Sequence, residues 1–171
     1  MSLDRAAGAP GDQAPRRLRV YTASSWKNDR YPSVVRAIRG EGFQVYDFRN
    51  PEPDGGAGCH WTEIDAGWRG WTPGRFRAAL DHPLARRGFG SDYAGMDWAD
   101  ACALVLPSGR SSHTEAGWMK GRGKPTFVLL ADGQEPELTY KLFDGVCLDV
   151  FELNVALATA ELALRRRGLL A

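Results

Sequence analysis

Short apolar segments alternate with amphipathic segments along most of the chain. The apolar runs predict strands over residues 17–22, 43–48, 101–106, 126–130 and 146–148. Amphipathic segments bounded by Pro and Gly predict helices over residues 32–39, 72–80, 89–99, 112–120 and 137–143. A last helix carries Leu153, Leu157, Ala160 and Leu164 on one stripe. This alternation is typical of a single α/β domain with a doubly wound parallel sheet of about five strands.

The most apolar of these strands leads into a turn of small polar residues. Ala101–Leu106 carries no polar side chain, so we expect this strand to be buried on both faces. Pro107 follows, and Ser108–Ser112 then lead into the next helix. In open parallel sheets, ligands bind at this carboxyl edge, and the free N–H groups of a new helix favour an anion there. We therefore expect a ligand site at this edge, with Glu115 beside the ligand.

The segment from residue 50 to residue 71 predicts no regular element. It contains many glycines together with Trp61, Trp68 and Trp71. A loop of this length is usually either functional or disordered, and its tryptophans argue against disorder. The tryptophans either close over a ligand or form a small satellite core under the loop.

Length and charge narrow the class of protein. The 171 residues are enough for one domain with a real core; we expect a disordered leader over residues 1–16 and the domain over residues 17–171. The chain has 22 Lys and Arg against 21 Asp and Glu. This near balance gives no electrostatic case for a nucleic-acid polymer or an anionic membrane as partner.

The chain shows no pattern of a membrane span, an export signal or a metal site. No apolar run approaches the ~20 residues that cross a bilayer, and the N-terminal segment lacks the apolar stretch of a signal peptide. The 3 cysteines are scattered without zinc-site spacing, and Cys102 and Cys147 lie in apolar runs, as buried thiols do. We expect a cytoplasmic protein that uses no metal and no cofactor.

Glu115 allows two interpretations. Ser112-His113-Thr114-Glu115 fits the S-x-x-E capping box, in which the glutamate bonds back to the N-cap amide. The same glutamate lies at the expected ligand edge, after small residues that would let a substrate approach closely. On this second interpretation, its carboxylate is a catalytic group.

Several other polar residues also allow a structural or a functional role. Tyr21 ends the first strand at the same edge, where it either holds a carboxylate in place or is a core tyrosine. Asp92 lies near the start of the expected helix, where the helix dipole favours an acid in any case. Asp100 lies between a helix and a strand, so we expect a structural cap. Arg110 is either a surface arginine or a phosphate partner. Gly121–Lys124 follows a helix, as a glycine cap does and a phosphate loop does not.

Three pieces of the chain together resemble the nucleoside 2-deoxyribosyltransferase family, which includes nucleoside 5′-monophosphate N-glycosidases. The first is Tyr21–Trp26 (YTASSW), and the second is Asp92 with Asp100 ahead of an apolar strand. The third is Ser111–Trp118 (SSHTEAGW), followed by Gly123–Pro125 (GKP). The ordered set covers about residues 17–150 and most resembles the CMP-hydrolase branch of the family.

The resemblance implies a flavodoxin-like fold and cleavage of the bond between a base and a (deoxy)ribose. It implies that Glu115 is the nucleophile, that Tyr21 orients it, and that Asp92 protonates or positions the leaving base, as in retaining glycosidases. The partner is then a small nucleoside or nucleotide. A homodimer or a higher homo-oligomer is implied as well. Substrate-binding residues are expected among Ser24, Trp26, Trp61, Ser108, Gly109, Arg110, Ser111 and Ser112.

One departure from the family pattern favours a phosphorylated substrate. The transferases carry an aspartate for the sugar 5′-hydroxyl six residues before the nucleophile, and here that position is Gly109, followed by Arg110. A turn of this kind suits a 5′-phosphate, held by backbone amides and serine hydroxyls. We therefore expect hydrolysis of a nucleoside 5′-monophosphate in preference to base exchange on a deoxynucleoside.

Two other functions are compatible with the same residues. The first is a domain that binds a nucleotide-derived signal without turning it over. The second is cleavage of NAD, because an α/β fold with a catalytic glutamate is also similar to TIR-like domains.

Overall fold

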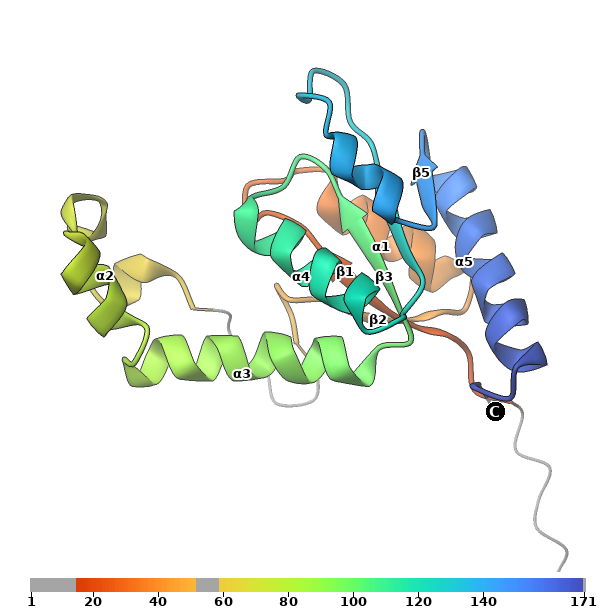
Figure 1. The fold of residues 1–171 in the computed structure, drawn as a ribbon, viewed down its shortest axis with the longest axis horizontal. Helices are drawn as coiled ribbons and strands as arrows, with labels where there is room; N and C mark the ends of the chain where they lie inside the picture. The colour runs from red at the N-terminus through yellow and green to blue at the C-terminus, as the bar shows by residue number, and fades with distance from the viewer. Residues whose placement is uncertain (1–14, 52–58, 171) are drawn as a thin grey trace, which may run out of the picture.

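The computed structural model describes residues 15–51 and 59–170 and shows five parallel strands in one sheet. The strands are β1 (Arg19–Ala23), β2 (Gln44–Tyr46), β3 (Ala101–Val105), β4 (Thr126–Leu129) and β5 (Gly145–Cys147). Their order in the sheet is β2-β1-β3-β4-β5, with every pair parallel (Figure 1). This is the flavodoxin-like order, so the predicted fold class is confirmed.

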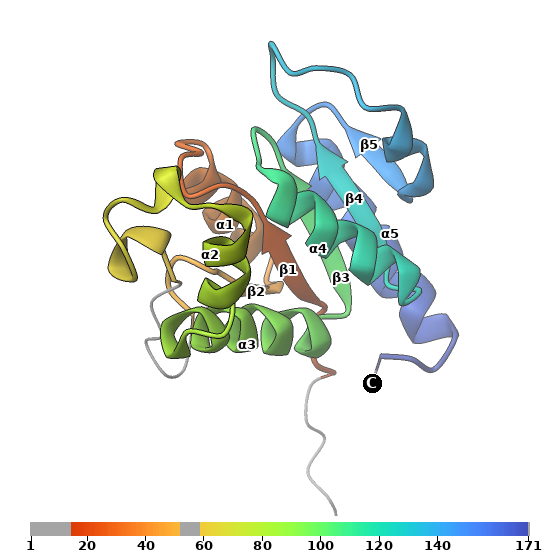
Figure 2. The same cartoon turned by 60° about the vertical axis from the view of Figure 1, so that its left-hand side comes forward.

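Helices cover both faces of the sheet (Figure 2). On one face lie α1 (Tyr31–Gly40) and α5 (Val150–Arg166), whose apolar residues share a core with Val20 and Leu129. The other face carries α3 (Pro83–Trp98) and α4 (Arg110–Gly121), with α2 (Pro73–Ala79) beyond them. The remaining elements are short 3-10 helices: η1 (Trp61–Glu63), η2 (Trp68–Gly70) and η3 (Leu138–Leu142).

The apolar runs explain which strands lie at the centre. All five residues of β3 are buried, as expected for a strand with neighbours and helices on every side. Side chains of β1 alternate between the two faces: Val20 belongs to the α1/α5 core, and Tyr21 belongs to the core under α3 and α4. The stripe predicted on the last helix is also confirmed, because Leu153, Leu157, Ala160 and Leu164 are all buried on α5.

Helix starts are the main difference from the sequence prediction. The helix expected from residue 89 begins at Pro83, because the His82 ring caps its first turn by accepting from the Leu84 amide, 3.2 Å away. Gly88 continues this helix and packs against Cys59, which a Cβ at position 88 would meet at 2.7 Å. The helix expected from residue 112 begins at Arg110. The segment near residue 140 is a 3-10 helix and not an α-helix.

Asp100 and Lys124 join the ends of elements, as structural residues do. The Asp100 carboxylate pairs with the Arg16 guanidinium and accepts from the Arg19 amide at 2.9 Å, so its expected structural role is confirmed. Lys124 donates to the carbonyls of Met96, Asp97 and Ala99 and thereby caps the end of α3. The Gly121–Lys124 segment ends α4 ahead of β4, with Gly123 at a φ of 77°, so the predicted glycine cap is confirmed.

The buried positions expected of two cysteines are confirmed. Cys102 and Cys147 are buried, unpaired thiols. None of the helices in the described residues is both long and apolar enough to cross a membrane. Of the expected leader, residues 1–14 lie outside the described residues.

Candidate functional site

Glu115 lies in the second turn of α4 with both carboxylate oxygens hydrogen-bonded. Its Oε2 accepts from the Tyr21 hydroxyl at 3.1 Å, and its Oε1 accepts from the Ser111 hydroxyl at 3.1 Å. The capping-box interpretation is wrong, because Gly109 is the N-cap of α4 and no described side chain caps it. The helix starts two residues earlier than that interpretation requires. The carboxylate bonds the Tyr21 hydroxyl of β1 and the Ser111 hydroxyl of α4, and not the N-cap amide.

Tyr21 lies in the middle of β1, which runs on to Ala23, so the expectation that it ends the strand is wrong. It is only 1% exposed, and its ring packs in the core between the sheet and helices α3 and α4. Burial raises the pKa of Tyr21 far above its usual range, and the negative charges of Glu115 and Asp92 raise it further. The phenol is therefore a permanent hydrogen-bond donor to Glu115 at neutral pH.

Asp92 belongs to the same site, although it is placed differently from the sequence expectation. It lies in the middle of α3 and not near its start, so the helix-dipole explanation for an acid at this position is wrong. Its Oδ1 accepts from the Tyr46 hydroxyl at 3.2 Å. The Tyr46 ring stacks on the Tyr21 ring, with centroids 5.2 Å apart and planes inclined by 11°. The two tyrosines thus connect the Asp92 and Glu115 carboxyl groups.

The charge of Asp92 also affects the pKa of Glu115. Burial raises the pKa of Glu115 and the charge of Asp92 adds to the effect, while the hydrogen bonds from Ser111 and Tyr21 oppose it. Burial likewise raises the pKa of Asp92, against the hydrogen bond from Tyr46. A pair of carboxyl groups with raised pKa values is suited to one acting as a base or nucleophile and the other as an acid.

The turn before α4 is open to solvent on one side and tied to the sheet on the other. Gly109, Arg110 and Ser111 are exposed, and Ser108 is half-buried. The first amide with an intrahelical partner is that of His113, which donates to the Gly109 carbonyl. The amides before it, at residues 110–112, are the free donors of the helix start.

Two serine hydroxyls of the expected binding set make structural hydrogen bonds. Ser112 is buried and donates to the Ser24 carbonyl at 2.8 Å. Ser24 in turn donates to the Val105 carbonyl at 2.8 Å and accepts from the Asn28 amide group. These bonds fasten the loop after β1 to β3 and to the start of α4, so the hydroxyls of Ser24 and Ser112 are already engaged.

Sequence reasoning missed three residues that shape this edge: Tyr46, Asn28 and Arg49. Arg49 donates to three carbonyls of the loop after β1, those of Ser25, Trp26 and Asn28. It thereby holds the loop that carries Trp26, whose ring is 47% exposed and meets Phe48 edge-on. The signal for Tyr46 was its place at the end of β2, beside Tyr21 on a parallel neighbour.

The three tryptophans of the segment after β2 lie in aromatic contacts of their own. Trp61 meets Trp71 and Phe76 edge-on, each at 5.7 Å, and Trp68 meets His60 at 6.2 Å. Such contacts are those of a satellite cluster, which is the second of the two interpretations given for this segment. Residues 52–58 of the segment lie outside the described residues.

A second row of rings borders Asp92. Phe89 and Tyr93 on α3 have centroids 5.9 Å apart, and Tyr93 lies 5.4 Å from Trp118 on α4. Trp118 is one helical turn after Glu115, so these rings join α3 to α4 close to Glu115.

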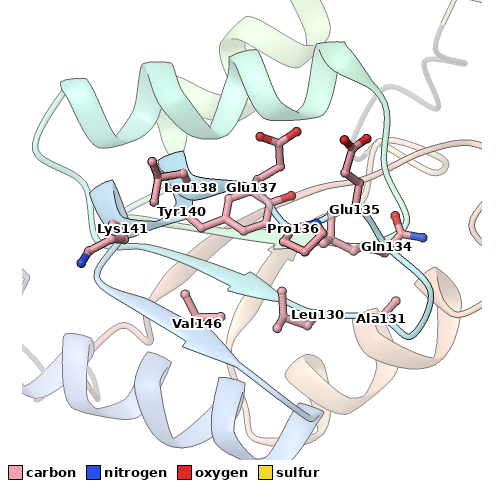
Figure 3. Close-up of a pocket in the computed structure, with 11 residues that line it drawn as sticks. Leu130, Ala131, Gln134, Glu135, Pro136, Glu137, Leu138, Tyr140, Lys141 and Val146 are labelled. Atoms are coloured by element: carbon pink, nitrogen blue, oxygen red, sulfur yellow. The ribbon is translucent and has the colours of Figure 1, made fainter.

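A separate pocket of about 480 Å³ opens between β4, β5 and η3 (Figure 3). Leu130 and Val146 lie on its strand side, and Leu138 and Tyr140 on its η3 side. The Tyr140 hydroxyl also meets His113 of α4 at 2.8 Å, so this pocket shares a wall with the start of α4. In the described residues, no three His, Cys, Asp or Glu side chains gather as a metal site would require.

Several solved structures have a fold similar to that of this chain. A 2-deoxyribosyltransferase from Bacillus psychrosaccharolyticus has a TM-score of 0.53 at 18% identity, covering 80% of this chain and 90% of its own. A conserved protein from Enterococcus faecalis V583 has a TM-score of 0.52 at 12% identity, covering 84% and 98%. The CMP N-glycosidase BcmB from Clostridium botulinum has a TM-score of 0.45 at 14% identity, covering 82% and 98%. No protein-family model and no curated protein matches the chain. At these identities, the likeness shows a shared fold.

Proposed function

We propose that this protein hydrolyses the N-glycosidic bond of a nucleoside 5′-monophosphate, with Glu115 as the nucleophile. The observation that carries the proposal is the orientation of Glu115 by Tyr21 and Ser111 beside a second half-buried carboxyl group, Asp92. Cleavage through a glycosyl ester needs one carboxylate to form the bond and one acid to assist the leaving group. The fold shared with a 2-deoxyribosyltransferase adds support.

The chemistry proceeds in two steps on these side chains. A carboxylate oxygen of Glu115 bonds to C1′ of the sugar while the C1′–N bond breaks. The electron pair of the C1′–N bond leaves with the base, and the base takes the proton of Asp92. Water then attacks C1′, gives a proton back to Asp92 and releases Glu115 as a carboxylate. Burial raises the pKa of Asp92, which favours the protonated form that the first step requires. Tyr21 donates to Glu115 and holds it in line.

The 5′-phosphate is assigned to the start of α4. Gly109 stands where the transferases carry an aspartate, and the free amides of residues 110–112 together with the helix dipole favour an anion. Arg110 is exposed at the first helical position, from which it can add a charge-assisted hydrogen bond. The Ser112 hydroxyl takes no part, because it is bonded to the Ser24 carbonyl.

The test of this function is a substrate panel read by chromatography of the free base. The panel pairs nucleosides and deoxynucleosides with their 5′-monophosphates, adds NAD, and includes a second free base to detect exchange. We expect free base from at least one monophosphate and little exchange product. Release from NAD alone, or binding of a nucleotide without release of its base, would contradict the proposal.

The phosphate site has its own test in the ratio of kcat/KM for a matched monophosphate and nucleoside. A charge-assisted hydrogen bond of roughly 1.5–3 kcal/mol predicts a preference of about 10- to 150-fold for the monophosphate. Arg110→Ala should reduce that preference, whereas Arg77→Ala, at an exposed arginine on α2, should leave it unchanged. Equal kcat/KM values for the pair in the wild type would refute the phosphate site.

We also propose that the chain self-associates. Large apolar side chains are exposed on η3 and around the start of α5: Leu138 at 82%, Leu142 at 67%, Leu148 at 68% and Phe151 at 76%. Exposed apolar side chains that gather in one patch mark a contact surface. Sedimentation equilibrium should give the mass of at least two chains. The double variant Leu148→Glu with Phe151→Glu should have the mass of one chain. A wild type that remains monomeric at high concentration would contradict this.

A further inference from the structure

Tyr46 is placed between the two carboxyl groups by the sheet register. It is the last residue of β2 and pairs with Tyr21 on the neighbouring parallel strand. Residues paired in this way point to the same face of the sheet, so both rings project under α3 and α4. Their parallel stacking at 5.2 Å fixes each ring against the other.

Helix α3 rests directly on the Tyr46 ring at Gly95. A Cβ at this position would lie 2.7 Å from the ring atoms Cδ2 and Cε2 and 2.8 Å from Cγ, so only glycine allows the helix to approach this closely. Asp92 is three residues before Gly95 and therefore on the same side of the helix. The contact at Gly95 brings the Asp92 carboxyl group within reach of the Tyr46 hydroxyl.

The hydrogen bonds of the Tyr46 hydroxyl form a directed chain. It donates to Asp92 Oδ1 at 3.2 Å, which leaves its oxygen to accept from the Ser91 hydroxyl at 3.0 Å. Burial raises the pKa of Tyr46 to about 12, so this group remains a donor across the neutral range. The other titratable groups that feel the charge of Asp92 are Tyr21 on β1 and Glu115 on α4.

We propose that Tyr46 is a positioning residue that holds the Asp92 carboxyl group toward the leaving base and, through its ring stacked on Tyr21, keeps Asp92 and Glu115 at a fixed separation. This role rests on the proposed function, in which Asp92 is the acid for the base. Tyr46 reaches the reaction only through Asp92 and Tyr21. Its hydrogen bond also stabilises the ionised form of Asp92 and so limits how far burial raises the pKa of that group.

The variants Tyr46→Phe and Gly95→Ala test this role in two different ways. Tyr46→Phe keeps the stacked ring and removes only the donor to Asp92. We expect kcat to fall by about 10- to 100-fold with little change in KM, since the acid for the leaving base is no longer held in position. Gly95→Ala displaces the ring itself and should lower kcat at least as much. Tyr31→Phe is the matched control, because it removes a buried phenol that is bonded to Thr22.

A pH measurement separates positioning from general stabilisation. Without the Tyr46 donor, the pKa of Asp92 should rise, so the basic limb of kcat should move to higher pH in Tyr46→Phe and not in Tyr31→Phe. Titration of ¹³C-labelled aspartate carboxyl groups by NMR, with Asp92 assigned from Asp92→Asn, measures the same shift without any substrate. An upward shift supports the role of Tyr46 even if no panel substrate is cleaved. An unchanged pKa of Asp92 in Tyr46→Phe overturns it, even if the wild type is an active hydrolase.

Discussion

The Tyr21 hydroxyl donates to Glu115 Oε2 across 3.1 Å and so joins the middle of β1 to the second turn of α4. The two residues are 94 positions apart in sequence, and the parallel pairing of β1 with β3 brings them together. Because the tyrosine is buried and the helix is packed on the sheet, the donor has no freedom to leave the carboxylate. Glu115 is therefore oriented before any ligand arrives.

Removal of this donor should slow the reaction without unfolding the protein. Tyr21→Phe keeps the ring stacked on Tyr46 and removes one hydrogen bond to a charged group, worth about 1.5–3 kcal/mol. We expect kcat to fall by about 10- to 150-fold. The same bond lowers the pKa of Glu115, so the acid limb of the pH profile should also move upward. A Tyr21→Phe enzyme with wild-type kcat and an unmoved acid limb would show that the contact is only structural.

Neutralising Asp92 should shift the acid limb in the opposite direction. The charge of Asp92 is the second cause, after burial, of the raised pKa of Glu115, so Asp92→Asn lowers that pKa. Glu115 must be ionised to attack C1′, and the acid limb of kcat/KM should therefore move to lower pH. Loss of the acid for the leaving base should also lower the rate by about 10²- to 10⁴-fold. An acid limb that stays in place in Asp92→Asn would indicate that the two carboxyl groups do not interact.

The half-buried Glu115 carboxylate should reduce the stability of the protein above acidic pH. The pKa of Glu115 is higher in the folded state than its ordinary value of about 4.3, so its favourable contribution is complete below that value and is lost as the pH rises through the folded pKa. Glu115→Gln does not titrate and avoids this loss. We expect the melting temperature of Glu115→Gln to rise relative to that of the wild type as the pH increases from 4 to 8. A difference between the two proteins that is constant with pH would refute this linkage.

Asp100 provides a contrasting variant with a structural effect alone. Asp100→Ala removes the pair with Arg16 and leaves the Arg19 amide without its acceptor, which costs about 1–3 kcal/mol. The melting temperature should fall by roughly 2 to 10 °C, while base release at a temperature well below the transition stays at the wild-type rate. A large loss of activity in a fully folded Asp100→Ala would show that this acid, and not only Asp92, serves the site.

Much of the fold was predictable because the strongest signals are local. The unbroken apolar run of β3 and the stripe of Leu153 and Leu157 on α5 identify buried elements without any tertiary information. The start of α3 was not predictable in the same way. Gly88 continues this helix because it packs against Cys59, a contact that no local pattern announces.

The residues of the candidate site were predictable from the sequence, but the contacts between them were not. Glu115 was expected at the carboxyl edge of the sheet because it follows an apolar strand, and Tyr21 because it was predicted to end the first strand, although β1 runs on to Ala23. The capping-box alternative failed because a start at Arg110 turns Glu115 away from the N-cap. The link from Asp92 through Tyr46 depends on the register of β1 with β2 and on where α3 crosses them, and both are tertiary properties.

The most direct test of Glu115 as the nucleophile is the rate of base release by Glu115→Gln from the best monophosphate of the panel. Glutamine keeps the size of the side chain and can still accept from Tyr21, so the fold and substrate binding should be retained, as circular dichroism and a titration with the monophosphate would verify. We predict that Glu115→Gln releases the base about 10³-fold more slowly than the wild type, or more slowly still, because no carboxylate is left to form the bond with C1′. A Glu115→Gln protein that releases the base at close to the wild-type rate would contradict it.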